Sequence, residues 1–176
     1  MIYVFLADGF EEIEALATVD ILRRASLEVK TVSINDTPKV LGAHGIPVLA
    51  DILFNEIDEE PQMIILPGGM PGTLNLRKFQ PLCDMLEEAK CYIAAICAAP
   101  SVFGELGLLK GEKATCYPGF EDKLEGAEIS DLPVVISNKV ITSRGAGTAH
   151  LFGFELVGLL KSPEEAENLK KVMMYE

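Results

Sequence analysis

The sequence predicts an α/β sandwich, with helices on both faces of a mostly parallel sheet. Short apolar runs alternate with helical segments along the chain, which is the pattern of β–α–β units. No repeat, linker or low-complexity tract interrupts this alternation. The length of 176 residues, with 49% hydrophobic and 24% charged residues, suits one globular domain over residues 1–176.

The first elements follow from hydrophobic periodicity. Residues 2–7, IYVFLA, form a short apolar run that predicts a buried strand. A helix is expected over 11–24, and residues 28–34 predict a second strand. Residues 39–50 hold two glycines between apolar stretches, which predicts a small hairpin at the edge of the sheet. The apolar face of the helix recurs at helical spacing, at Ile13, Leu16, Ala17 and Ile21.

The middle of the chain predicts two central strands, each followed by a turn and a helix. QMIILPGG, at 62–69, is a strand that ends in two glycines, and a helix is expected over 79–89. YIAAIC, at 92–97, is the next strand, and a helix over about 98–106 follows it. Both turns therefore lie at strand ends, where ligands bind in open α/β sheets.

The last third of the chain predicts two or three short strands and two helices. Strands are expected over 114–117 and 134–143, with a turn at SNK, residues 137–139. A long helix over 148–160 follows the glycines of RGAGT. SPEE, at 162–165, has the composition of a helix start, with a capping serine and a proline in first position.

Charge and cysteine usage exclude several classes of protein. The formal charge of −12 should repel nucleic acid and anionic membranes, so we expect neither as a partner. No basic leader and no apolar run of ~20 residues is present, which favours a cytoplasmic protein. The four cysteines show no CxxC or zinc-site spacing, so we expect free thiols and no metal site.

One of these thiols, Cys97, stands where a buried strand ends and a helix begins. Free cysteine is often only core filling. At such a turn, however, the N–H groups of the helix start favour an anion, so the thiol pKa should fall and the reactive thiolate should form. The small neighbour Ala98 suits a sharp nucleophile turn. The pattern alone leaves both interpretations open.

Four motifs in order resolve this ambiguity by resemblance. They are GFEEIEA (9–15), ILPGGMPG (65–72), AAICAAP (94–100) and TSRGAGTA (142–149). Together they resemble the ThiJ/PfpI superfamily, in the branch of the parkinsonism-associated protein and its bacterial relatives. The resemblance spans nearly the whole chain and implies a flavodoxin-like sandwich of the class I glutamine amidotransferase-like type. It also implies a homodimer and an oxidation-prone cysteine at the nucleophile turn, which is Cys97.

The resemblance also assigns roles to other residues. Glu14 matches the family's buried glutamate beside the thiol. A carboxyl next to a thiolate should keep its proton, because two adjacent anions repel, and it can then act as general acid or base. Gly69 and Ala98 match positions whose N–H groups form an oxyanion hole. Candidate anion contacts by resemblance are Arg24 and Arg144.

Two neighbours of Glu14 receive a plainer interpretation. Glu11 and Glu12 are expected to be surface charges that complement the helix dipole. For the helix of residues 11–24 as a whole, Ile21 and Leu22 are side chains that could supply a dimer face, although an apolar helix face is usually core.

The sequence departs from the family pattern at its histidines. Tyr117 stands where relatives with strong glyoxalase activity carry a histidine, and a phenol with a pKa near 10 is a poor base at pH 7. Ala98 replaces the histidine that follows the cysteine in the protease-like branch, which argues against a peptidase. His44 lies in the predicted hairpin and could approach a site across a dimer, whereas His150 lies on a mostly apolar helix. A Cys–His–acid triad is not supported.

Two functions remain as hypotheses. In the first, the Cys97 thiolate attacks a small 2-oxoaldehyde such as methylglyoxal, or its adducts, and Glu14 moves a proton, without any cofactor. This is a glyoxalase or deglycase. In the second, the protein is an oxidative-stress sensor or chaperone in which Cys97 is oxidised to a sulfinate. A thiazole-phosphate role in thiamine synthesis is disfavoured, because no GxxxxGK[ST] loop is present.

Overall fold

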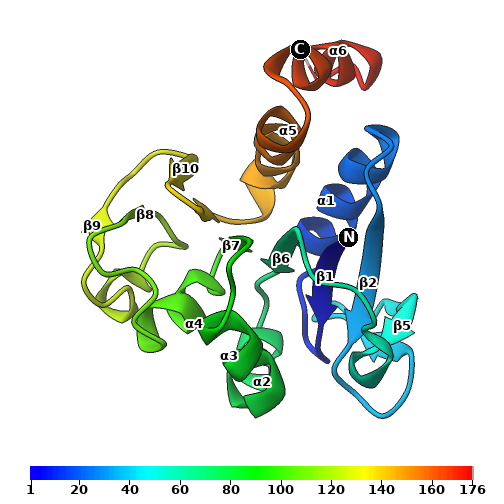
Figure 1. The fold of residues 1–176 in the computed structure, drawn as a ribbon, viewed down its shortest axis with the longest axis vertical. Helices are drawn as coiled ribbons and strands as arrows, with labels where there is room; N and C mark the ends of the chain where they lie inside the picture. The colour runs from blue at the N-terminus through cyan, green and yellow to red at the C-terminus, as the bar shows by residue number, and fades with distance from the viewer. Residues whose placement is uncertain (176) are drawn as a thin grey trace.

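The computed structural model, which describes residues 1–175, confirms the α/β prediction: a seven-stranded sheet lies between two layers of helices (Figure 1). Its strands run in the order β10-β11-β7-β6-β1-β2-β5. Neighbouring strands are parallel except for the β10–β11 pair. The strands are β1 (Ile2–Leu6), β2 (Val29–Ser33), β5 (Ile52–Leu53), β6 (Met63–Leu66), β7 (Tyr92–Ile96), β10 (Val134–Ser137) and β11 (Val140–Ser143).

The two faces of the sheet bury two separate cores. Strand β1 shows why, since alternate residues of a strand point to opposite faces: Ile2 and Val4 join one core, and Tyr3 and Phe5 join the other. The first core is covered by α1 (Glu12–Arg24), α5 (Ala149–Leu160) and α6 (Pro163–Val172). The second is covered by α2 (Gly72–Lys78), α3 (Gln80–Glu87) and α4 (Pro100–Glu105).

The hairpin expected over 39–50 forms, but not at the edge of the main sheet. Strands β3 (Lys39–Leu41) and β4 (Pro47–Leu49) pair only with each other, and β5 is the edge strand. Of the six residues in the two strands, only Val40 is buried, so packing against the main sheet contributes little to the stability of the hairpin. Its turn packs instead against the start of α1, where His44 contacts Glu12.

The strand expected over 114–117 is shorter than predicted. Strand β8 (Lys113–Ala114) pairs with β9 (Glu128–Ile129) in a separate two-stranded sheet. Beyond it, the N–H of Thr115 donates to the hydroxyl of Thr142, and the N–H of Tyr117 donates to the carbonyl oxygen of Cys97. These tertiary contacts take the place of a strand ladder and bring the segment to the end of β7.

The buried face of α1 also differs from the prediction. Ile13 and Leu16 were expected in the core but are 52% and 38% exposed. Ile21 and Leu22, considered above for a dimer face, are completely buried. The reason is the close approach of α5: a Cβ on Gly153 would lie 2.9 Å from Cδ1 of Ile21. The exposed apolar residues of α1 therefore lie in its first turns.

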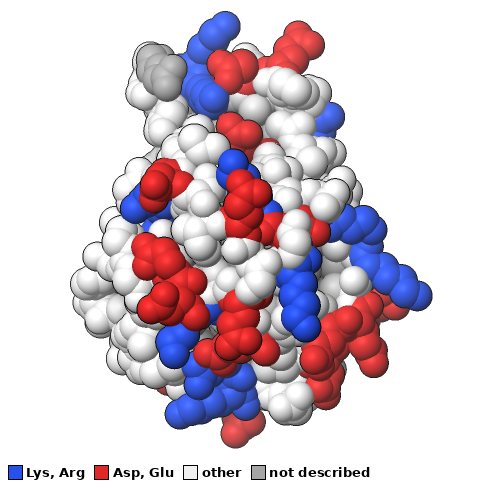
Figure 2. Space-filling view, turned by 90° about the vertical axis from the view of Figure 1, so that its left-hand side faces the viewer, with Lys and Arg blue, Asp and Glu red and all other residues white. Residues whose placement is uncertain are grey.

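Residues 1–175 also contain three short 3₁₀ helices: η1 (Phe54–Glu56), η2 (Glu121–Lys123) and η3 (Ala146–Thr148). Within the described part of the chain, no helix is both long and apolar enough to cross a bilayer. The face shown in Figure 2 carries acidic and basic side chains interspersed among uncharged ones.

Candidate functional site

Cys97 occupies a strained turn between β7 and α4. Its φ angle is +66°, in the left-handed region that non-glycine residues rarely adopt. The backbone is held on both sides, because its N–H donates to the Ser143 carbonyl oxygen (2.9 Å) and its carbonyl oxygen accepts from the Tyr117 N–H (2.8 Å). The thiol is partly exposed. Such over-determined strain is typical of functional sites and fixes the direction of the side chain.

Glu14 reaches the same place from the first turn of α1. Its side chain is 1% exposed, and Oε2 accepts the Gly68 N–H at 2.8 Å. Glu11 is the N-cap of the helix, and its Oε2 accepts the N–H of Glu14 at 2.7 Å. Oε1 of Glu14 has no hydrogen-bond partner among the described residues, and the carboxyl lies beside the Cys97 thiol.

This juxtaposition changes the acidity of both groups. Burial raises the pKa of Glu14 to about 7, against the opposing effects of the Gly68 N–H and the thiol, and the charge of Glu11 raises it further. Burial and then the Glu14 carboxylate raise the pKa of the Cys97 thiol to about 12. Because the two groups are coupled, the pair holds at least one proton at neutral pH.

The raised thiol pKa corrects the expectation that the helix start would lower it. The N–H groups of Ala98 and Gly69 do face the sulfur and lower its pKa. Their effect is smaller than that of burial and of the neighbouring carboxylate. The thiol is therefore protonated at rest.

The other cysteines show that acidity alone does not distinguish Cys97. Burial also raises the thiol pKa of Cys83 and Cys91, and raises that of Cys116 to about 11. Cys91 lines a groove of about 1320 Å³ between residues 57–62 and the end of α3, away from Glu14. What sets Cys97 apart is its left-handed backbone and the carboxyl beside it.

The other predicted site residues lie in different parts of the fold. Tyr117 is 51% exposed, and its ring and Glu14 Oε1 both border Gly145. The guanidinium group of Arg144 forms an ion pair with Asp131, at a distance of 3.4 Å. Arg24 lies in the last turn of α1, at the opposite end from Glu14, and pairs with Asp20. The ring of His150 stacks on Tyr175.

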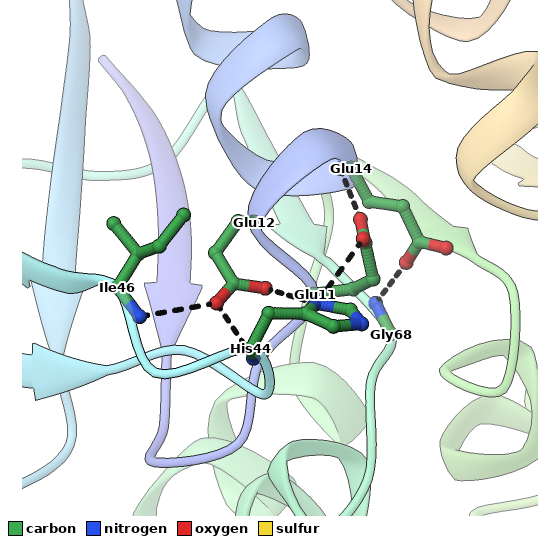
Figure 3. A network of polar contacts seen from close by, with 6 residues as sticks. All are labelled: Glu11, Glu12, Glu14, His44, Ile46 and Gly68. Atoms are coloured by element: carbon green, nitrogen blue, oxygen red, sulfur yellow. Dashed lines mark hydrogen bonds and ion pairs between the residues drawn. The ribbon is translucent and has the colours of Figure 1, made fainter.

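His44 lies on the β3–β4 turn and contacts α1 rather than Cys97 (Figure 3). Its Nδ1 is 2.8 Å from Oε2 of Glu12 and 3.9 Å from Oε1 of Glu11. Glu12, expected to be a surface charge, is only 5% exposed. Its carboxylate accepts hydrogen bonds from the backbone N–H groups of His44 (2.8 Å) and Ile46 (3.5 Å). Burial raises the pKa of Glu12, but these two bonds and the bond to the His44 imidazole together lower it below its ordinary value.

The same three side chains are the one group with metal-ligand composition among residues 1–175. Ligand atoms of Glu11, Glu12 and His44 lie within 4.8 Å of one another. Both oxygens of Glu12 already accept hydrogen bonds, however, which satisfies the buried carboxylate without an ion. We therefore interpret the group as an ion-pair network.

Two features of the site were not predicted from the sequence. Gly68 is essential to the packing, because a Cβ there would lie 2.6 Å from the Cβ of Cys97 and 2.7 Å from Glu14 Oε2. The Glu12–His44 pair joins segments 32 residues apart. The two adjacent glycines at 68–69 were a signal for the first feature, whereas no local pattern indicates the second.

Comparison with known proteins identifies the family of the chain. A family model described as the DJ-1/PfpI family matches residues 1–159. A relative from Arabidopsis thaliana, Protein DJ-1 homolog B, is 41% identical over 92% of this chain, which spans only 38% of that protein. Glutathione-independent glyoxalase DJR-1.2 of Caenorhabditis elegans is 35% identical over 92% of this chain and 88% of its own length.

A solved structure gives the same picture of the fold. Toxoplasma gondii DJ-1, in a structure titled as oxidized, matches with a TM-score of 0.91 at 38% identity, over 98% of this chain and 97% of that one.

Proposed function

Because the chain belongs to the DJ-1/PfpI family, we propose that it is a cofactor-free, Cys97-dependent glyoxalase that converts small 2-oxoaldehydes such as methylglyoxal to hydroxy acids. Adducts of these aldehydes, the substrates of a deglycase, would enter by the same chemistry. The observation that carries the proposal is the buried carboxyl of Glu14 beside the thiol of Cys97, with the N–H groups of Gly69 and Ala98 facing the sulfur. The name of the Caenorhabditis elegans relative supports the substrate class.

The first step is attack of sulfur on the aldehyde carbon. Glu14, with a pKa of about 7, is partly ionised at neutral pH and accepts the thiol proton as the S–C bond forms. The carbonyl π electrons move to oxygen, and the Gly69 and Ala98 N–H groups are placed to stabilise that oxyanion. Proton return to oxygen gives a hemithioacetal.

The second step moves hydrogen between adjacent carbons. The Glu14 carboxylate removes the proton from the former aldehyde carbon and returns one to the neighbouring carbon, through an enediol. The product is a thioester of lactic acid on Cys97. Water then cleaves the C–S bond, the acid leaves, and the thiol recovers its proton. No external hydride acceptor is needed, because one carbon is oxidised as its neighbour is reduced.

The assay follows methylglyoxal loss and lactate formation without added thiol. Wild type should turn over, whereas Cys97→Ser should fall to the uncatalysed rate because it lacks the nucleophile. Glu14→Gln keeps the acceptor for the Gly68 N–H but cannot take a proton, so a loss of ~100-fold or more is expected. Cys91→Ser is the matched control and should retain wild-type turnover. Absence of turnover in wild type would remove this substrate.

A second candidate function is an oxidative-stress sensor in the cytoplasm. Two equivalents of hydrogen peroxide would convert the Cys97 thiol to a sulfinic acid with release of two waters. The same N–H groups and a protonated Glu14 are placed to donate hydrogen bonds to sulfinate oxygens. Peptide mass after peroxide titration tests this function. Oxygen uptake at Cys97 no faster than at buried Cys83 would exclude it.

We further propose that the protein acts as a homodimer through the first turns of α1. Ile13 and Leu16 are exposed apolar residues of that helix, and Ile46 on the β3–β4 turn is 53% exposed. The N–H of Ile46 donates to Glu12, so this side chain lies beside the start of α1. A second copy of the chain is the occupant that the family resemblance favours. No interface residue proposed here is part of the Glu14–Cys97 pair.

A further inference from the structure

Three charged or dipolar groups, His44, Glu11 and Gly68, form a continuous path from the protein surface to Glu14 (Figure 3). His44, whose side chain is 69% exposed, lies 3.9 Å from Oε1 of Glu11. The other oxygen of Glu11 accepts the N–H of Glu14, and the N–H of Glu11 donates to the carbonyl oxygen of Gly68 at 2.9 Å. Gly68 in turn donates its N–H to the Glu14 carboxyl. Neither His44 nor Glu11 is identified as a contact of the Cys97 thiol.

We propose that His44 tunes the Glu14–Cys97 pair from outside the site, by offsetting the negative charge of Glu11. His44 and Glu11 are thus positioning residues that act through Glu14, and they set the pH range in which the pair works. The inference rests on the Glu14–Cys97 pair of the proposed function, although it does not depend on turnover or on any particular substrate.

Among the groups around Glu14, Glu11 is the principal charged neighbour. Cys97 faces Glu14 from the β7–α4 turn, and the Gly68 N–H faces it from the end of β6. The Tyr117 ring borders the same space from the segment after β8. Glu11 is the charge that raises the pKa of Glu14. Arg144, the nearest arginine in sequence to Gly145, is paired with Asp131.

His44 lies close enough to Glu11 for its own charge to offset part of the negative charge of that carboxylate. Glu12, and to a smaller extent Glu11, raise the pKa of the imidazole, so His44 carries positive charge over more of the neutral range. Glu12 also accepts hydrogen bonds from the backbone N–H groups of His44 and Ile46. A protonated His44 at 3.9 Å therefore partly cancels the field of Glu11 at Glu14.

This arrangement predicts opposite shifts from two substitutions in the same network. His44→Gln removes the positive charge, leaves Glu11 unopposed and moves the first titration midpoint of the pair to higher pH. Glu11→Gln keeps an oxygen for the N-cap but removes the negative charge, so the midpoint moves to lower pH. Each shift should be about 0.3 pH unit, because the charges act through partly exposed side chains. His44→Arg keeps the charge and should restore a midpoint at or below that of wild type.

The experiment measures the rate of Cys97 alkylation by iodoacetamide between pH 5 and 9, read by mass spectrometry of its peptide. Alkylation needs the thiolate but no turnover, so its outcome is independent of the glyoxalase assay. On the acid side of the midpoint, His44→Gln should react about twofold more slowly than wild type and Glu11→Gln about twofold faster. Raising the salt concentration to 0.5 M should shrink both differences.

Arg77→Gln and Glu105→Gln are the matched controls. They remove the same charges from an exposed ion pair between α2 and α4, and they should leave the midpoint unchanged. Opposite shifts with rescue by His44→Arg support the proposal. Unchanged midpoints, or shifts in the same direction for both network variants, would overturn it, because mere loosening of α1 would affect both alike.

Discussion

Gly68 and Cys97 approach so closely that a Cβ at residue 68 would lie 2.6 Å from the Cβ of Cys97. The same Cβ would lie 2.7 Å from Oε2 of Glu14, whose hydrogen bond comes from the Gly68 N–H. The glycine thus brings the ends of β6 and β7 and the first turn of α1 together at one point. The carboxyl and the thiol can be neighbours only because no side chain separates them.

Gly68→Ala should therefore damage the site more than the fold. The added methyl group must displace Cys97 or Glu14, so we expect a loss of turnover of at least tenfold and a cost of about 1–3 kcal/mol in unfolding free energy. Gly147→Ala is the control, since nothing lies within 4 Å of the corresponding Cβ. Methylglyoxal turnover and urea denaturation of both variants check this. Wild-type turnover in Gly68→Ala would contradict the packing argument.

Glu14→Gln should change how folding stability depends on pH. The pKa of Glu14 is raised from 4.5 to about 7, so the native state binds this proton more tightly than the unfolded state. Its stabilising contribution is complete below pH 4.5 and is lost as the pH rises through about 7. Wild type should lose on the order of 3 kcal/mol across this window relative to Glu14→Gln.

Urea denaturation at pH 5 and pH 8 measures this difference. Glu105→Gln, an exposed carboxyl change, is the control and should follow wild type at both values. If the unfolding free energies of wild type and Glu14→Gln differed by the same amount at pH 5 and pH 8, the buried carboxyl would not hold its proton in the native state.

Leu16→Arg should disrupt the proposed homodimer. The guanidinium would have to be buried against the apolar side chains of the second copy, at a cost that one face cannot offset. Sedimentation equilibrium should give a dimer for wild type and a monomer for the variant. Ile136→Arg, on the distant edge strand β10 where residue 136 is 43% exposed, should remain dimeric. A monomeric wild type, or two dimeric variants, would place the interface elsewhere or abolish it.

The main alternation of strands and helices, and the turn that carries Cys97, could be predicted from the sequence, whereas α2, β5 and β9 were not predicted. Apolar runs of six residues and helical spacing report local burial, so 2–7, 62–69 and 92–97 could be identified as strands. Ser162 also caps α6 as predicted, accepting the N–H of Glu165, because capping depends only on neighbouring residues. The motifs added Glu14 by resemblance.

The acidity of the site and the partners of its charges could not be predicted from the sequence, because they depend on how the folded elements pack together. Glu12 is buried and paired with His44, and the thiol pKa of Cys97 is raised rather than lowered, because both outcomes depend on segments far apart in sequence. Ile13 and Leu16 point outward because α5 packs on the other side of α1. Burial and charge pairing are long-range quantities, and they arise only when the elements meet.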